Sequence, residues 1–261
     1  MLLENKNAIV YGAGGGIGGG VARAFAGSGA RVFLAGRTRD KLDIVAREIA
    51  AAGGQAEVAV LDALDEQAVD EHARAVASQA GSIDVSFNLV SRGDVQGIPL
   101  ADMTTADFVR PITTAITTTF ITARAAARHM IEQGSGVILA LNSGSAHGSP
   151  MMGGTGPADA TIDTYIRNLA VEVGPHGVRV LGIWAAGIPE TMSPQRLAAV
   201  NRDLQLDDAA FQGLLQGLDE MRMLRRSPRL AQVADLAVFL ASDQAAALTG
   251  SFVNVTGMFP S

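Results

Sequence analysis

Short apolar runs alternate with longer amphipathic segments along nearly the whole chain, and this alternation most constrains the fold. Short runs of this kind predict strands, and the segments between them show the 3.6-residue spacing of helices. The predicted strands cover residues 7–12, 30–36, 56–62, 83–90, 136–142, 177–185 and 251–257. A strand-helix alternation of this kind predicts an α/β protein with a parallel sheet covered by helices on both faces.

Four segments between the strands are predicted helices, and several end at glycine, which adopts the left-handed C-terminal conformation at little cost. These helices cover residues 21–29, 39–54, 65–81 and 106–134. Ligands of such sheets bind outside the carboxyl ends of the strands. We therefore expect the functional residues in the segments that follow strands.

Composition limits the functions that the chain can have. With 261 residues and 48% hydrophobic content, one domain covering residues 1–261 is expected. A net charge of −6 without a long basic block argues against nucleic acid as a partner. The absence of cysteine excludes disulfides, thiolate nucleophiles and Cys-ligated metals, and no metal site is predicted. The charged stretch MLLENKN does not suit a signal peptide, so we expect a cytoplasmic protein that binds no membrane and acts on small molecules.

A glycine-rich segment follows the first predicted strand. Gly12, Gly16 and Gly18 in YGAGGGIGGGVARAF allow a tight turn and the close approach of a pyrophosphate to a helix N-terminus, where free N–H groups and the helix dipole favour anions. This strand-turn-helix context favours dinucleotide binding. The alternative is a glycine turn that only packs the helix on the strand.

The glycine pattern resembles the TGxxxGIG motif of the short-chain dehydrogenase/reductase family. Asp62 resembles its adenine-contacting Asp, and Asn88 resembles the first Asn of its NNAG motif. Residues 169–183 and 236–257 are similar to the family's late helix-strand blocks. The resemblance covers essentially the whole chain and implies a single-domain Rossmann-like, doubly wound parallel sheet with strand order 3-2-1-4-5-6-7. The cofactor contacts that it implies are Gly12, Gly15, Gly16, Ile17, Gly18, Asp62, Ala63, Asn88, Ile188 and Thr191.

The residues after the second predicted strand indicate the cofactor. Members that prefer NAD(H) carry an acidic residue there, whereas this chain has Gly36 followed by Arg37. A guanidinium can hold a 2′-phosphate through charge-assisted hydrogen bonds. NADP(H) is therefore favoured over NAD(H), the alternative being that Arg37 is only a solvated residue at the start of the next helix.

The resemblance also locates the active site, and there the chain departs from the family. Ser143 matches the serine that binds the substrate carbonyl. Aligning LAVEV with the family's LAxEx places Thr155 at the position of the general acid/base Tyr and Asp159 at that of the Lys. A register shifted by one residue places Gly156 and Ala160 there instead, which restores neither group.

No other residue supplies the missing pair. The tyrosines are Tyr11, under the expected cofactor, and Tyr165, about 240° around the helix from Asp159. The lysines, Lys6 and Lys41, both lie in the first coenzyme-binding half. Ala115 replaces the family's relay Asn as well.

Any proton donor must then come from Ser143, Ser145, His147 or Thr155. His147 is the candidate whose side chain ordinarily titrates near neutral pH, although a loop histidine is more often inert. Ser143 could instead be a strand-end serine bonded to backbone. TGPAD itself is a good helix start, with Thr155 or Gly156 predicted as N-cap and Asp159 at the positive end of the helix dipole.

Residues 189–228 are placed like the family's substrate lid. Their apolar side chains could cover a partly apolar ligand, or could only pack two small helices onto the domain. These side chains are Met192, Phe211, Leu214, Leu215, Leu218, Met221 and Met223.

Three functions therefore remain open. The first is an NADP(H)-dependent oxidoreductase with a substitute proton relay, the second is the same fold used for a non-redox reaction, and the third is a non-catalytic partner of an active relative. The helices at 106–133 and 157–174 resemble the family's subunit interface, which predicts a homotetramer or at least a homodimer, with Pro111 as a possible bend.

Overall fold

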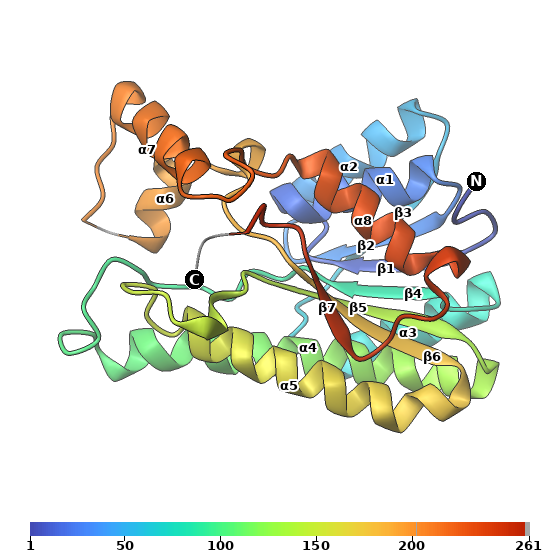
Figure 1. Ribbon diagram of the computed structural model, residues 1–261. Coiled ribbons are helices and arrows are strands. Elements are labelled where there is room, and N and C mark those ends of the chain that lie inside the picture. The colour runs from blue at the N-terminus through green and yellow to red at the C-terminus, as the bar shows by residue number, and fades with distance from the viewer. Residues whose placement is uncertain (202, 259–261) are drawn as a thin grey trace.

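A computed structural model describes residues 1–201 and 203–258 and contains one seven-stranded parallel sheet (Figure 1). The strands are β1 (Asn7–Tyr11), β2 (Arg31–Gly36), β3 (Gln55–Val60), β4 (Val85–Asn88), β5 (Gly136–Asn142), β6 (Val178–Trp184) and β7 (Ser251–Asn254). Their spatial order is β3-β2-β1-β4-β5-β6-β7, and every neighbouring pair is parallel. The predicted fold class and strand order are thus confirmed.

Helices cover both faces of the sheet. They are α1 (Gly16–Gly27), α2 (Arg39–Ala51), α3 (Glu66–Ala80), α4 (Thr105–Gln133), α5 (Thr155–Val173), α6 (Pro194–Val200), α7 (Asp208–Glu220) and α8 (Leu230–Ala241). The described residues also form the short 3₁₀ helices η1 (Ser145–His147), η2 (Gly174–His176), η3 (Pro189–Thr191) and η4 (Asp243–Ala245). Helices α1, α2 and α8 lie on one face of the sheet and α3, α4 and α5 on the other (Figure 1). The buried residues of each set form a separate core cluster.

Strand β1 shows why the apolar runs are continuous. Ala8 and Val10 belong to the first core cluster, while Ile9 and Tyr11 belong to the second. Successive side chains of a strand point to opposite faces, so a strand covered on both faces is apolar throughout. The functional residues therefore follow the strand ends rather than lying inside them.

Helices α4 and α5 pack side by side on one face of the sheet (Figure 1). The hydroxyl of Thr104 caps α4 by accepting a 3.1 Å hydrogen bond from the Asp107 amide, and the helix ends at Gly134 in the left-handed conformation. Pro111 lies inside α4 without ending it. Among the residues described, no helix is both long and apolar enough to span a lipid bilayer.

Helices α6 and α7 stand apart from these layers (Figure 1). Neither helix contains a buried residue. The segment is anchored where α7 ends, because the buried guanidinium of Arg222 donates to the carbonyl oxygens of Ala186, Gly187 and Thr256. A buried side chain therefore anchors the chain just after α7, whereas α6 and α7 themselves bury none.

Candidate cofactor pocket and active site

The turn between β1 and α1 requires glycine at two positions. Gly12 has a positive φ of 76°, and a Cβ there would overlap the carbonyl group of Leu89. A Cβ on Gly18 would overlap the carbonyl of Gly12. The strand, the turn and the helix therefore pack too closely for any side chain, which exposes backbone N–H groups at the start of α1.

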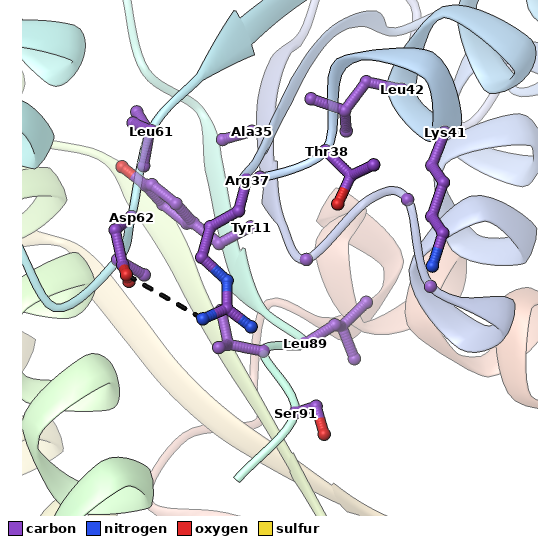
Figure 2. Close-up of a pocket in the computed structure, with 16 residues that line it drawn as sticks. Tyr11, Ala35, Arg37, Thr38, Lys41, Leu42, Leu61, Asp62, Leu89 and Ser91 are labelled. Carbon is purple, nitrogen blue, oxygen red and sulfur yellow. Dashed lines mark ion pairs between the residues drawn. The ribbon is translucent and has the colours of Figure 1, made fainter. Parts of the chain in front are cut away.

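A cavity of about 220 Å³ adjoins this turn (Figure 2). Of the predicted cofactor contacts, five line it: Gly12, Gly15, Arg37, Asp62 and Ala63. It also contains residues that the sequence argument missed, namely Thr38 and Lys41 from the start of α2. Lys41 packs directly against the glycine turn, because a Cβ on Gly14 would lie 3.0 Å from the Lys41 Cβ.

The electrostatics of this cavity are mixed. The Arg37 guanidinium is 73% exposed and lies 3.9 Å from the Asp62 carboxylate. Thr38 is the N-cap residue of α2 and its side chain forms no capping hydrogen bond. The cavity is therefore lined by one carboxylate, Asp62, and by two cations, Arg37 and Lys41. The Thr38 side chain adds a hydroxyl.

The other predicted cofactor contacts lie elsewhere. Gly16, Ile17 and Gly18 form the first turn of α1. The amide of Asn88 donates to the hydroxyls of Thr118 and Thr119 at 3.2 and 3.1 Å, and so ties β4 to α4 instead of lining the cavity.

Two further predicted contacts follow β6. Ile188 is buried in the core beside α8. Thr191 lies against Gly16, where a Cβ would meet its side chain at 3.2 Å. Only Thr191 of this pair therefore reaches the glycine turn.

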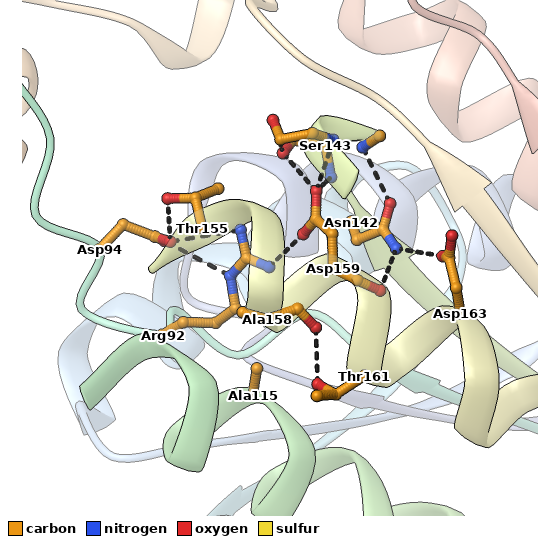
Figure 3. Close-up of polar contacts among 12 residues, drawn as sticks. Arg92, Asp94, Ala115, Asn142, Ser143, Thr155, Ala158, Asp159, Thr161 and Asp163 are labelled. Atoms are coloured by element: carbon orange, nitrogen blue, oxygen red, sulfur yellow. Dashed lines mark hydrogen bonds and ion pairs between the residues drawn. The ribbon is translucent and has the colours of Figure 1, made fainter. Parts of the chain in front are cut away.

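A second group of polar residues surrounds Asp159 (Figure 3). Its carboxylate is completely buried and accepts hydrogen bonds from the Ser143 hydroxyl at 2.6 Å, the Ser143 amide at 3.1 Å and the Ser145 amide at 2.8 Å. The hydroxyls of Ser143 and Ser145 lie 2.8 Å apart. Asp159 thus fixes the turn after β5, and it does more than interact with the helix dipole.

The fourth partner of Asp159 is Arg92, a residue that the sequence argument missed. Its Nη1 lies 2.5 Å from the Asp159 carboxylate, and its Nη2 lies 3.3 Å from Asp94. The Arg92 side chain is only 14% exposed. Burial lowers the pKa of Arg92, but the two carboxylates outweigh this effect and leave it raised. Arg92 is therefore a buried cation that joins the chain after β4 to α5.

Thr155 belongs to the same network. Its hydroxyl donates to Asp94 at 2.8 Å and receives a long hydrogen bond of 3.4 Å from the Gln96 side chain. The N-cap of α5 is Gly154, so the prediction of Thr155 or Gly156 as N-cap was wrong. The Thr155 side chain instead links the start of α5 to Asp94 in the chain after β4.

The remaining candidates do not join this network. His147 is exposed, and its ring lies edge-on to Trp184 with 5.5 Å between the centroids. Tyr165 packs edge-on against Phe120, and burial raises its pKa to about 12. Among the described residues, no cluster of three or more His, Asp or Glu side chains has the arrangement of a metal site.

Known proteins resemble this chain over nearly its whole length. A family profile described as enoyl-(acyl carrier protein) reductase matches residues 12–257. The 7α-hydroxysteroid dehydrogenase of Escherichia coli is 31% identical over 98% of this chain and 95% of its own length. The L-rhamnose 1-dehydrogenase (NAD(P)⁺) of Azotobacter vinelandii is 33% identical over 98% of this chain and 97% of its own length. A solved structure of 7α-hydroxysteroid dehydrogenase with NADH and 7-oxo glycochenodeoxycholic acid has a TM-score of 0.81 at 29% identity, and covers 98% of this chain and 95% of that one.

The chain belongs to the short-chain dehydrogenase/reductase family. Short-chain dehydrogenases/reductases use NAD(H) or NADP(H), and the residues present here fit such a dinucleotide. Gly15 and Gly16 place no side chain of their own over the N-terminus of α1, and the cavity beside it has the basic and hydroxyl groups that a nucleotide needs. In this family the cofactor supplies or accepts a hydride, and the protein positions it.

Proposed function

We propose that the protein is an NADP(H)-binding, oxidoreductase-like member of the family whose active site lacks the usual acid/base pair. One observation carries this proposal. The carboxylate of Asp159, at the position aligned with the family's Lys, is buried and engaged by Ser143, Ser145 and Arg92. A cofactor cradle is thus combined with a catalytic position that carries the opposite charge.

The preference for NADP(H) rests on the residues at the mouth of the cavity. Gly36 leaves no carboxylate at the end of β2, where one would hold ribose hydroxyls and repel a phosphate. Arg37 and Lys41 both line the cavity, and Thr38 adds a hydroxyl that no cap interaction uses. Two cations and a hydroxyl suit a 2′-phosphate.

The active-site proposal follows from where the protons are. The Ser143 hydroxyl donates to Asp159, so its hydrogen is not directed at a substrate carbonyl. The Thr155 hydroxyl likewise donates to Asp94. A threonine hydroxyl is in any case a poor acid at neutral pH. Ser143, Thr155, Asp159 and His147, the candidate catalytic residues, therefore do not reproduce the acid/base function of the family's Tyr/Lys pair.

We further propose that residues 1–261 form one domain, with residues 189–228 as its substrate lid. Apolar side chains on α6 and α7 are half-buried rather than fully packed, as expected if they line a space that a ligand fills. Met192, Leu214 and Leu218 suit a partly apolar small molecule, closer to a steroid than to a sugar.

Two measurements test this proposal. Calorimetric titration should show tighter binding of NADPH than of NADH, and absorbance at the nicotinamide band should show no oxidation of NADPH by simple ketones. Cofactor binding without turnover is the expected result, and the second candidate, a non-catalytic or non-redox protein, shares it because the Asp159 carboxylate is fully engaged. Turnover of simple ketones at an ordinary rate would contradict the proposed active site. Failure to bind either dinucleotide would overturn the proposal.

A further inference from the structure

Two side chains from the lid segment lie on the glycine turn. A Cβ on Gly16 would stand 3.2 Å from the Arg196 guanidinium and 3.2 Å from the Thr191 side chain. Gly16 is the first residue of α1, and Gly15 before it has no side chain with which to cap the helix. Arg196 therefore places a positive charge beside backbone N–H groups that already favour an anion.

The position of Arg196 is fixed, but its charge is not neutralised. Its Nη1 donates to the carbonyl oxygen of Thr191 at 2.8 Å, and its backbone amide donates to the Ser193 hydroxyl at 3.2 Å. Across residues 1–201 and 203–258, Arg196 forms no ion pair. A guanidinium has five N–H donors, so most of its capacity remains available for an anion.

The other end of α6 contacts the active-site network. The Val200 carbonyl accepts a 2.7 Å hydrogen bond from the Gln96 amide. The Asn201 side chain occupies the space where a Cβ on Gly97 would lie. Gln96 in turn contacts Thr155, which is bonded to Asp94. Helix α6 thus forms a continuous connection from the glycine turn to the loop that carries Arg92.

We propose that Arg196 binds the pyrophosphate of the dinucleotide and thereby closes α6 over it, which fixes residues 89–104 at the active site. This inference rests on the proposed cofactor binding. The anion is the missing partner of Arg196, and its two negative charges would face one exposed guanidinium and the N-terminus of α1. Because α6 has no buried residue, its position depends on such end contacts more than on packing.

Arg196→Gln tests this assignment, with Arg226→Gln as a control that removes the same charge from an exposed position in the same segment. Calorimetry with NADPH should show affinity about 10-fold or more weaker for Arg196→Gln and unchanged for the control. Adenosine 2′-monophosphate, which lacks the pyrophosphate, should bind both variants like the wild type. Equal NADPH affinity in Arg196→Gln and wild type would overturn the inference and leave cofactor binding intact. Absence of NADPH binding by the wild type would overturn the proposed function itself, and this inference with it.

Hydrogen exchange gives a second readout that does not depend on turnover. Saturating NADP⁺ should slow exchange in residues 194–201 and 89–104 of the wild type. In Arg196→Gln, NADP⁺ at saturation should protect the glycine turn but protect residues 194–201 much less. Equal protection of α6 in both proteins would show that another contact closes the lid.

Discussion

The hydroxyl of Ser143 donates a 2.6 Å hydrogen bond to the buried carboxylate of Asp159. The same carboxylate also accepts the backbone amides of Ser143 and Ser145. The turn after β5 is therefore built on Asp159, and the hydrogen of Ser143 points into the protein. A substrate near Ser143 would meet an oxygen lone pair rather than a proton.

Replacing Arg92 with Met should destabilise the protein strongly. The substitution leaves the Asp159 and Asp94 carboxylates close together and without their cation, and breaking a buried ion pair in this way costs about 3–5 kcal/mol. Urea unfolding measures the loss. Asp159→Asn should cost less, because the amide oxygen can still accept hydrogen bonds, and the double variant should be more stable than the sum of the two effects implies.

Arg39→Gln is the matched control, since it breaks an exposed ion pair with Asp43 and should change stability by about 0.5 kcal/mol or less. A loss of the same small size in Arg92→Met would mean that the network around Asp159 is not structurally important.

Replacing Arg37 with Gln should weaken NADPH binding by about 10–100-fold, because a charge-assisted hydrogen bond to the 2′-phosphate is lost. NADH has no 2′-phosphate, so its affinity should remain within about twofold of the wild-type value. Titration calorimetry measures both. Arg47→Gln removes an exposed charge from α2 away from the cavity and should change neither affinity. An equal effect of Arg37→Gln on both cofactors would contradict the assignment of Arg37 to the phosphate.

Periodicity predicted a parallel sheet covered by helices, because covering such a sheet on both faces requires continuous apolar strands. The strand order followed from the resemblance to the short-chain dehydrogenase/reductase family and not from periodicity. Strand β5 was predicted at its observed bounds, residues 136–142, and the other strands to within a few residues. The glycine turn was also predicted, from the spacing of Gly12, Gly16 and Gly18 after the first strand. The structure gives the reason for this spacing at Gly12 and Gly18, where any side chain would collide with backbone. These features depend on residues close together in sequence.

The contacts of Asp159 could not be predicted in this way. Its cation, Arg92, lies 67 residues earlier in the chain, and nothing in the local sequence marks that residue as buried. The helix-dipole interpretation of Asp159 used only its neighbours and therefore missed the buried pair. The sequence placed Lys41 in the coenzyme-binding half but did not predict its contact with the cavity. Its position beside Gly14 depends on how α2 packs against the glycine turn.

His72 should make stability depend on pH below neutrality. It lies edge-on to Tyr11 with 6.2 Å between the ring centroids, and burial lowers its pKa to about 4. In the unfolded chain the pKa of His72 is near 6.5. Between pH 6.5 and pH 4 the unfolded chain therefore binds more protons than the folded protein, so stability falls as the pH drops through this range. This effect accounts for about 2 kcal/mol between pH 7 and pH 5.

His72→Gln removes this titration and should flatten the fall in unfolding free energy by that amount, measured with urea at pH 7 and pH 5. An equally steep fall in the variant would assign the pH dependence to other groups.

The outer surface of α4 and α5 should associate with copies of the chain. Phe120 on α4 is 44% exposed and Val171 on α5 is 77% exposed, although the two helices are long and otherwise well packed. Apolar side chains exposed on adjacent helices favour a helix-bundle interface. Light scattering should give a homotetramer, or at least a homodimer, and Val171→Glu should shift it towards smaller species. A wild-type mass near the monomer's 26.9 kDa at micromolar concentration would refute this prediction.

The central claim is that this member of the family binds its cofactor but has no acid placed to protonate a carbonyl oxygen. The most direct test is the rate at which wild-type protein, saturated with NADPH, oxidises it in the presence of a panel of simple ketones. Because proton transfer from a positioned acid contributes about 10²–10⁴-fold, the expected rate is lower than that of an active relative by at least this factor. Turnover at an ordinary rate, about 1 s⁻¹ or faster, would contradict the account, since Ser143 or another group would then have to supply the proton.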